Sequence, residues 1–307
     1  MRAGSKRSPY NLGMKRFTVA TTTLFLILAS TAFAGDRPTT IDEFFDAGAQ
    51  TRVIAHRGFS SRAPENTLVA IREAIAIGAD MAEIDVTLSS DEEIVVIHDE
   101  TLQRTTNGSG LVAQSTLAEL KDLDAGSWFG PLFAGERIPT LDEVLATVNG
   151  KILLNIEIKS EAVEGGIAAG VVETVRRHEM KDRVVISSFS PTALEQVHSL
   201  APQFTTAVLY NQDLQRGLDA VDIVDSLGAS VFNIRRKRLT STMMRRCLEH
   251  GIPVGIYTVN KKRHMRRMIK KGVAAIFTDH PDRLIKVMQR NSPPVPQPIL
   301  APAHATP

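Results

Sequence analysis

Cysteine is almost absent from this sequence: Cys247 is the single cysteine among 307 residues. One cysteine excludes an internal disulfide and a metal cluster built on several thiolates. Aromatic residues make up only 5% of the chain, and no basic stripe with interleaved aromatic residues is present. Because such stripes are the usual mark of nucleic-acid binding, we expect no nucleic-acid partner.

An excess of charge of one sign is also absent. The chain has 36 basic and 34 acidic residues, a net charge of +2. Residues 1–34 hold five basic residues and no acidic one, so removing them leaves a body of charge −3. A nearly neutral body has no global field that attracts polyanions. Its 43% hydrophobic and 23% charged residues are instead typical of a globular protein with a large core.

Residues 1–34 have the three-part layout of a secretory signal peptide. Basic residues up to Arg16 precede the apolar run FTVATTTLFLILASTAFA, which ends in small residues at Ala32 and Ala34. A permanent membrane anchor is the alternative, because the run approaches the length that spans a bilayer. Cleavage predicts a periplasmic or secreted protein without a stable membrane span. Met14 is an alternative start that would give a more compact signal.

Two further segments flank the expected folded domain, which covers residues 51–291. Residues 35–50 are interpreted as an N-terminal linker. Residues 292–307, SPPVPQPILAPAHATP, contain six prolines and cannot hold a helix or an inner strand. We therefore expect a disordered proline-rich tail.

Between residues 51 and 290, short β-branched runs alternate with longer amphipathic stretches. This alternation is typical of parallel strands joined by helices. No GxGxxG motif follows the first strand, which disfavours an open dinucleotide-binding sheet. The number of predicted strands favours an α/β fold of the (β/α)8 TIM-barrel type. The predicted strands are Val53–His56, Ala82–Leu88, Ile152–Ile158, Val184–Ser187, Thr205–Leu209, Ser230–Ile234, Val254–Val259 and Ala275–Thr278.

One segment interrupts the alternation after the second strand. An extra short strand is predicted at Ile94–His98, and residues 99–139 follow without a clear strand-helix unit. Long loops of this kind inside a compact domain are usually functional or have a small substructure of their own. We expect this insertion to lie over the mouth of the barrel.

Helix starts support the alternation. Thr140 with Glu143 predicts a capping box, and Ser190 before Pro191 predicts a capped helix with proline in its first turn. Asn260 is expected to cap the helix KKRHMRRMIKK.

Charged residues gather at the ends of the first strands, where TIM barrels place their active sites. Glu83 and Asp85 lie two apart on one strand and face the same side, and Glu157 follows on the next. Three carboxylates without a nearby cysteine suit Ca²⁺ or Mg²⁺. Simple pairing with the adjacent cations Arg57 and Lys159 is the alternative.

Two histidines occur at the same rim. His56 ends the first strand and His98 ends the extra strand, so one imidazole on each side of a substrate can serve as acid and base. Arg57 and Lys159 offer donors that suit a phosphate. Metal, arginine and lysine together favour an anionic substrate and phosphoryl chemistry over glycoside hydrolysis.

The string AHRGFSSRAPENTLVAIREAIAIGADMAEIDVTLSSDEEIVVIHDETLQRTTNG resembles the opening of the glycerophosphodiester phosphodiesterase family. The strings LDAGSWFG, IPTLDEVL, NIEIKS, ISSFSP, YTVN and FTDHPD follow in the family's order, so the resemblance spans residues 51–285. It implies a TIM-barrel hydrolase that uses a divalent cation, Ca²⁺ or Mg²⁺, to split small glycerophosphodiesters into sn-glycerol 3-phosphate and an alcohol.

The resemblance also implies roles for individual residues. It makes His56 and His98 the acid/base pair, Glu83, Asp85 and Glu157 the metal ligands, and Arg57 and Lys159 phosphate-binding residues. It further implies attack by the neighbouring glycerol hydroxyl through a cyclic phosphate. Glu65 is expected to support the first loop or to act as an acidic residue at a helix start. Tyr257 replaces the tryptophan frequent in the family before TVN, and with Phe189 and Trp128 it is a candidate for lining the pocket.

Three other functions are compatible with this sequence. A lysophospholipase D or sphingomyelinase D type enzyme would use the same residues on lipid phosphodiesters, and an exposed apolar lip in residues 125–134 would favour it. A noncatalytic periplasmic phosphodiester-binding protein would need the cations but not two histidines. A metal-dependent sugar hydrolase is disfavoured by the cationic surroundings.

Overall fold

The computed structural model describes residues 37–46, 48 and 50–291. The expected signal peptide and the proline-rich tail therefore lie outside the described residues. No helix within the described part of the chain is long and apolar enough to cross a membrane.

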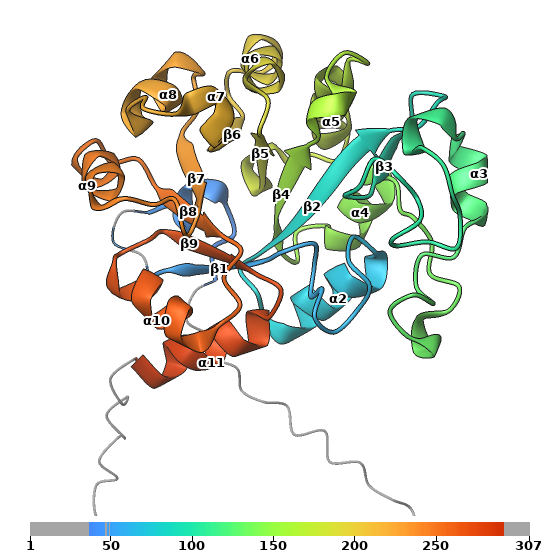
Figure 1. Ribbon diagram of the computed structural model, residues 1–307, viewed down its shortest axis with the longest axis horizontal. Helices are drawn as coiled ribbons and strands as arrows, with labels where there is room; N and C mark the ends of the chain where they lie inside the picture. The colour runs from blue at the N-terminus through green and yellow to red at the C-terminus, as the bar shows by residue number, and fades with distance from the viewer. Residues whose placement is uncertain (1–36, 47, 49, 292–307) are drawn as a thin grey trace, which may run out of the picture. The chain divides into compact units, whose positions relative to one another are not determined.

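Eight parallel strands close into a barrel, which confirms the predicted TIM-barrel fold (Figure 1). Each strand pairs with its neighbour, and β1 closes the ring by pairing with both β2 and β9. The strands are β1 (Arg52–Ala55), β2 (Met81–Leu88), β4 (Leu153–Ile158), β5 (Val184–Ser188), β6 (Thr205–Leu209), β7 (Val231–Arg235), β8 (Val254–Tyr257) and β9 (Ala275–Thr278). Their bounds lie within two residues of the predicted ones.

Helices pack around the barrel because their apolar faces contact the outward side chains of the strands. These helices are α2 (Leu68–Ile77), α4 (Leu141–Val148), α5 (Ile167–Arg177), α6 (Pro191–Leu200), α8 (Ala220–Ser226), α9 (Ser241–Glu249), α10 (Lys262–Lys270) and α11 (Pro281–Asn291), with the short α7 (Gln212–Gln215) after β6. The capping box of Thr140 and Glu143 is present at α4, and Ser190 caps α6, as predicted.

Within the stretch 35–50, the chain forms a short helix, α1 (Ile41–Phe44), capped by Thr40. Ile41 and Phe44 are buried in one cluster with residues from the starts of the strands, among them Met81, Leu153 and Val185. This helix therefore covers the end of the barrel at which the strands begin, opposite the expected active site.

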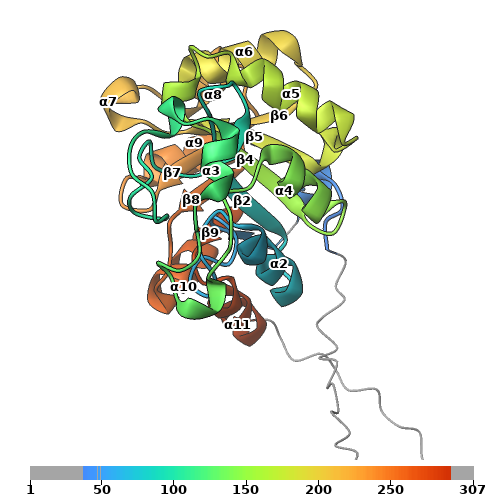
Figure 2. The same cartoon turned by 90° about the vertical axis from the view of Figure 1, so that its right-hand side faces the viewer.

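The insertion after β2 has a small core of its own. β3 (Ile94–Val96) pairs antiparallel with β2, outside the barrel. The short helix α3 (Leu117–Asp122) follows, with η1 (Val112–Gln114) and η2 (Pro131–Phe133) on either side. Residues such as Ile97, Leu102 and Leu120 pack together beneath these elements. In Figures 1 and 2 the insertion flanks β2 and β3 rather than closing over the barrel.

Candidate active site

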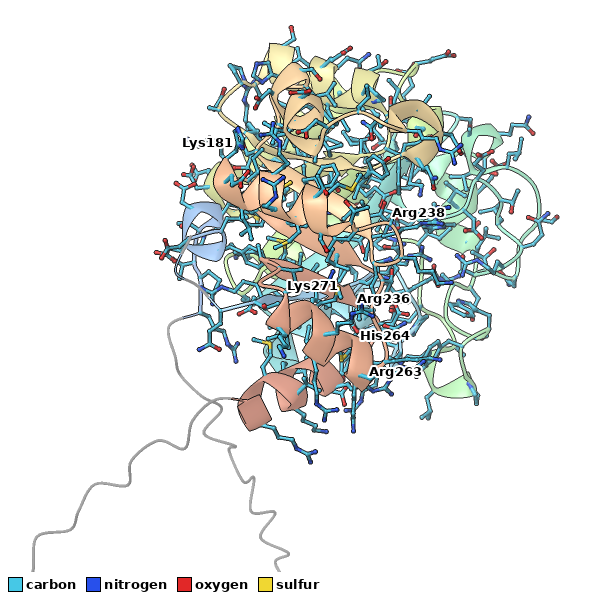
Figure 3. The ribbon with its side chains drawn as sticks, turned by 60° about the vertical axis from the view of Figure 1, so that its left-hand side comes forward. Lys181, Arg236, Arg238, Arg263, His264 and Lys271 are labelled. Carbon is cyan, nitrogen blue, oxygen red and sulfur yellow. The ribbon has the colours of Figure 1, made fainter. Side chains whose placement is uncertain are left out.

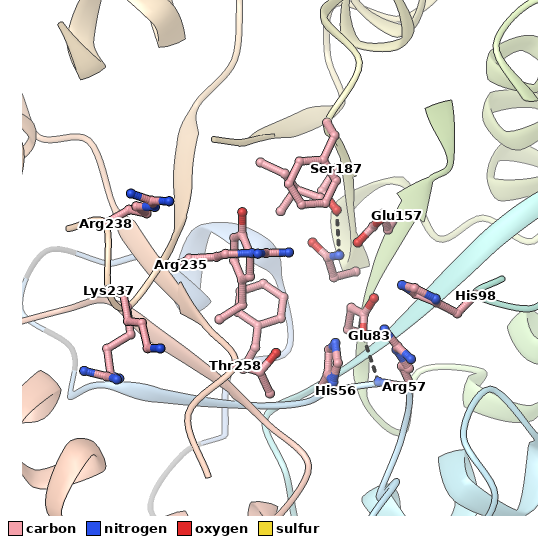
Figure 4. A pocket seen from close by; sticks show the side chains of 16 residues that line it. His56, Arg57, Glu83, His98, Glu157, Ser187, Arg235, Lys237, Arg238 and Thr258 are labelled. Atoms are coloured by element: carbon pink, nitrogen blue, oxygen red, sulfur yellow. Dashed lines mark hydrogen bonds between the residues drawn. The ribbon is translucent and has the colours of Figure 1, made fainter. Parts of the chain in front are cut away.

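A cavity of about 720 Å³ opens at the carboxyl ends of the strands (Figure 4). It brings together residues from most strands of the barrel. Its lining includes His56, Arg57, Glu83, His98, Asn155, Glu157, Ser187, Phe189, Arg235 and Tyr257. This is the position at which the sequence predicts the site.

The three predicted carboxylates converge. Asp85 on β2 pairs in register with Glu157 on β4, and Glu83 precedes Asp85 on the same face. One oxygen from each of these three residues lies within 4.8 Å of the others. Glu83 and Asp85 are buried, so their like charges repel in a region of low dielectric.

Neighbouring cations neutralise this acidic group only in part. Lys159 Nζ lies 3.0 Å from Glu157 Oε1 and 3.6 Å from Asp85 Oδ1, and Arg57 Nε lies 3.3 Å from Asp85 Oδ2. Although burial would raise the pKa of Asp85, Lys159 and Arg57 hold it below its usual value. Burial and Asp85 raise the pKa of Glu83 to about 8, and they raise that of Glu157 to about 6.

The donor set fits a hard divalent cation. Three carboxylates supply oxygen ligands of the kind that Ca²⁺ and Mg²⁺ prefer, and the group contains no thiolate. Glu83 has no ion pair with any other described side chain, so simple pairing does not account for the whole group. The backbone N–H of Arg57 donates to Glu83 Oε2 at 2.7 Å and fixes the orientation of the Glu83 carboxylate.

Each predicted histidine is held by an aspartate. His56 Nδ1 lies 2.7 Å from Asp279 Oδ1, and His98 Nδ1 lies 2.6 Å from Asp99 Oδ1. The pKa values of both aspartates lie below the usual range, so the carboxylates accept and the imidazole Nδ1 atoms donate. This arrangement leaves Nε2 of each ring available for proton transfer in the cavity.

The two imidazoles differ electrostatically. Burial lowers the pKa of His56, but Glu83 and Asp279 outweigh it, and the pKa lies above its usual value. The pKa of His98 lies below its usual value because of burial, which Arg57 and Lys159 reinforce against the opposing effect of Asp85.

Glu65 contacts two arginines rather than the start of α2. Thr67, not Glu65, caps α2. The Glu65 carboxylate accepts from Arg57 Nη1 at 2.5 Å and from both terminal nitrogens of Arg104 at 2.8 and 2.9 Å. Arg104 also donates to both oxygens of Asp99. A continuous chain of charged contacts thus links His98 to Arg57 through the insertion.

The first loop has an unusual backbone conformation. Arg57 has a φ of +56°, and Gly58 follows with a φ of +78°. A Cβ at Gly58 would lie 2.7 Å from the backbone of Ala70, so the close approach of α2 requires glycine. This turn directs the Arg57 N–H towards Glu83 while its side chain reaches Glu65 and Asp85.

Aromatic side chains form one wall of the cavity. Phe189 and Tyr257 meet edge to face with ring centroids 5.9 Å apart, and both line the cavity. Trp128 is a correction to the sequence interpretation, because it is not among the lining residues. Its indole Nε1 donates to the Ala125 carbonyl, and its ring packs against Phe129 within the insertion.

Asn260 is a second correction. It does not cap α10, whose N-cap position is Lys261 without a side-chain hydrogen bond. Instead its amide oxygen accepts from the Asp279 N–H at 3.0 Å and from the Thr278 hydroxyl at 3.1 Å, and its amide nitrogen donates to Asp279 Oδ2. Asn260 therefore orients the aspartate that holds His56.

Sequence reasoning missed five residues of this site. All five belong to strings that resemble the family, and Asp99, Asn260 and Asp279 also follow a predicted strand. Neither signal reveals which side chain each residue contacts. The five residues are Asn66, whose amide bonds Asp85 at 2.8 Å, together with Asp99, Arg104, Asn260 and Asp279.

Comparison with known proteins gives consistent matches. Residues 56–283 match the model of the glycerophosphoryl diester phosphodiesterase family. A glycerophosphodiester phosphodiesterase of Caldanaerobacter subterraneus is 42% identical over 245 residues, covering 78% of this chain and 99% of that protein. One from Bacillus subtilis is 34% identical over 257 residues, covering 76% and 85%.

A solved structure agrees with this family match. A phosphodiesterase of Oleispira antarctica, in complex with the product sn-glycerol-3-phosphate, is similar with a TM-score of 0.74 and 32% identity. The similarity covers 78% of this chain and 97% of that one.

Proposed function

This chain belongs to the glycerophosphoryl diester phosphodiesterase family, and on that premise we propose how its site hydrolyses glycerophosphodiesters. The chain is a glycerophosphodiester phosphodiesterase. In our proposal the products are sn-glycerol 3-phosphate and an alcohol, and a divalent cation is required. The pair of histidines held by aspartates on either side of three carboxylates is the observation that carries this proposal.

Glu83, Asp85 and Glu157 would hold the cation, Ca²⁺ or Mg²⁺. When bound, such an ion polarises phosphoryl oxygens and offsets the negative charge of the transition state. Asn66 keeps Asp85 in place, and the Arg57 N–H keeps Glu83 in place, so the ligands are oriented before the ion binds.

Arg57 and Lys159 would bind the scissile phosphate. Both already lie beside the carboxylates, at 3.3 and 3.6 Å from Asp85, and both are largely buried. Charge-assisted hydrogen bonds in such surroundings stabilise the charge that develops during an in-line displacement.

The histidines would exchange protons in two steps. In the first, one imidazole removes the proton of the neighbouring glycerol hydroxyl, whose oxygen attacks phosphorus, and the other protonates the departing alcohol oxygen. In the second, water opens the cyclic phosphate while the two rings reverse their roles. Ser187, the serine of the cavity, bonds Asn155 at 2.8 Å rather than either histidine, which favours the substrate hydroxyl as nucleophile.

Glycerophosphocholine hydrolysis tests this function. The purified protein is incubated with the diester, with and without EDTA, and glycerol 3-phosphate is followed by a coupled dehydrogenase. We expect release that EDTA abolishes and that Ca²⁺ or Mg²⁺ restores. An analogue that lacks the attacking glycerol hydroxyl should be inert, and rapid turnover of it would overturn the internal-attack route.

We also propose that the protein acts in the periplasm or outside the cell. The basic start, the apolar run and the small residues Ala32 and Ala34 support this location. Fractionation of expressing bacteria with N-terminal sequencing should place a chain beginning at Gly35 in the periplasm or the medium. A full-length chain retained in the membrane would contradict the proposal.

One observation favours a second substrate class, lipid-bearing phosphodiesters. The insertion exposes Leu132 to 93% and Trp128 to 40%, which is the apolar lip such substrates would contact. Neither residue lines the cavity. Choline release from a lysophospholipid at a rate comparable to glycerophosphocholine hydrolysis would support this class. If Leu132→Ser loses choline release but keeps glycerophosphocholine hydrolysis, the apolar lip binds the lipid-bearing substrate.

A further inference from the structure

Four consecutive cations begin at the last residue of β7 and have no role in the reaction described above. They are Arg235, Arg236, Lys237 and Arg238. The end of a barrel strand is where substrate-contacting residues are placed in this fold. All four side chains line the same cavity as His56, Glu83 and His98.

These cations have no anionic partner within the described part of the chain. No carboxylate lies within ion-pair distance of any of their side chains, although Arg57 and Arg104 at the site are both paired with carboxylates. Arg235, Lys237 and Arg238 are exposed and Arg236 is partly buried. Adjacent like charges destabilise the free protein by self-repulsion, and an anion bound between them removes that penalty.

The loop that carries the cations is held by its backbone. Arg238 N–H donates to the Arg235 carbonyl at 2.8 Å, and Arg236 N–H donates to the Tyr257 carbonyl at 3.1 Å. The loop is therefore tied to β8 and presents its side chains at a defined place. Preorganised donors bind an anion at lower entropic cost than donors on a mobile loop.

The cations lie apart from the phosphate-binding residues. Figure 4 shows Lys237 and Arg238 across the cavity from His98 and Glu157, with Arg235 between the two groups. Tyr257 pairs in register with Arg235 and lines the cavity between the two groups. Arg57 and Lys159 already serve the scissile phosphate, so the second group is available to another anion.

The surface beside the cavity increases the positive potential. Arg236 lies near Arg263 and His264 of α10 (Figure 3). Arg235 and Arg238 also line an adjoining hollow of about 280 Å³ beyond Phe189, in which Asp213 is the acidic residue. A cationic hollow next to a concave site concentrates field on anions that enter it.

We propose that Arg235, Arg236, Lys237 and Arg238 form a second anion subsite, which binds a phosphate carried by the alcohol arm of the substrate. This inference rests on the proposed function, in which the glycerol phosphate arm is common to every substrate. An additional phosphate then belongs to the variable alcohol. The preferred substrates are accordingly diesters whose alcohol is itself phosphorylated.

Two matched diesters test the subsite: glycerophosphoinositol and glycerophosphoinositol 4-phosphate, which differ by one phosphate. We expect kcat/KM to be about tenfold or more higher for the phosphorylated diester, as one or more charge-assisted hydrogen bonds would give. The preference should decrease at high ionic strength, because exposed charges are screened. Equal kcat/KM for the two diesters would overturn the proposal.

Substitutions assign the preference to the loop. The variant Arg235→Gln/Lys237→Gln/Arg238→Gln should lower the preference to within about threefold of unity while hydrolysis of glycerophosphoinositol changes little. Arg235→Lys/Arg238→Lys should retain part of it. Lys181→Ala is the matched control, because Lys181 in η4 (Lys181–Arg183) precedes β5 at the opposite end of the barrel.

The outcomes also separate this proposal from the function itself. If neither diester is hydrolysed, the proposed function fails. If both are hydrolysed and the triple variant keeps the full preference, the subsite fails alone. If the variant instead loses only its binding to vesicles of phosphatidylglycerol, with the preference unchanged, the loop serves a membrane surface and the proposal is wrong.

Discussion

Asp279 Oδ1 lies 2.7 Å from His56 Nδ1, although 223 residues separate the two in the sequence. The pairing of β1 with β9 closes the barrel and brings them together, since His56 follows β1 and Asp279 follows β9. His56 N–H also donates to the Thr278 carbonyl at 3.1 Å. The closure of the fold thus positions one of the two proton-transferring groups.

Asp279→Asn should lower kcat by about a hundredfold or more, because the amide no longer holds the tautomer in which Nε2 of His56 is free. We expect a small change in KM, since Asp279 does not contact the phosphate in our proposal. Steady-state kinetics with glycerophosphocholine measure both. Asp282→Asn, on the first turn of α11, is the control and should retain activity. Full kcat in Asp279→Asn would contradict this positioning role.

Glu83→Gln and Asp85→Asn should each abolish activity together with the rise of the melting temperature on adding Ca²⁺ or Mg²⁺. Loss of a ligand removes both effects, because an ion that binds only the folded state stabilises it by mass action. Differential scanning fluorimetry with and without each ion measures the stabilisation. Glu93→Gln, an exposed residue between β2 and β3, should behave as the parent protein. Undiminished melting shifts in both ligand variants would exclude these ligands.

In EDTA, the stability contributed by the buried carboxylates should fall as pH rises. The pKa of Glu83 is raised to about 8 and that of Glu157 to about 6, from 4.5, so the folded state binds these protons more tightly than the unfolded state. Their contribution is complete below about pH 4.5 and is lost as pH passes through 6 and 8. Urea unfolding of the parent and Glu83→Gln at pH 5.5 and 8.5 should show the variant gaining stability relative to the parent at the higher pH. A pH-independent difference would refute this.

Arg104→Ala should lower kcat by about tenfold to a hundredfold without unfolding the barrel. Arg104 holds Asp99, which orients His98, and it shares Glu65 with Arg57, so its loss loosens both sides of the phosphate site. Arg104→Lys should restore little, because an ammonium cannot make the bidentate contacts. Arg137→Ala, an insertion arginine that donates to the Asp122 carbonyl, is the control. If both Arg104 variants are as active as the parent protein, the contacts of Arg104 with Asp99 and Glu65 are dispensable for catalysis.

Much of this protein follows from local sequence pattern. The alternation of β-branched runs with amphipathic stretches predicted all eight barrel strands, because strand and helix periodicities act over a few residues. The same reasoning placed His56, Glu83, Asp85 and Glu157 at one rim, since parallel strands end on the same side of a barrel. Resemblance to a family then added the substrate class, the products and the cyclic-phosphate route.

The tertiary structure alone decided which side chains meet. The contacts of Asp279 with His56 and of Arg104 with Glu65 join segments that only barrel closure and the packing of the insertion bring into reach. Asn260 bonds Asp279 instead of capping α10, and Trp128 packs into the insertion instead of the cavity. The nearly balanced net charge gave no indication that the run Arg235–Arg238 is functional. The structure places this run at the mouth of the barrel, where its residues line the cavity. Such contacts depend on distance in space, which local periodicity does not encode.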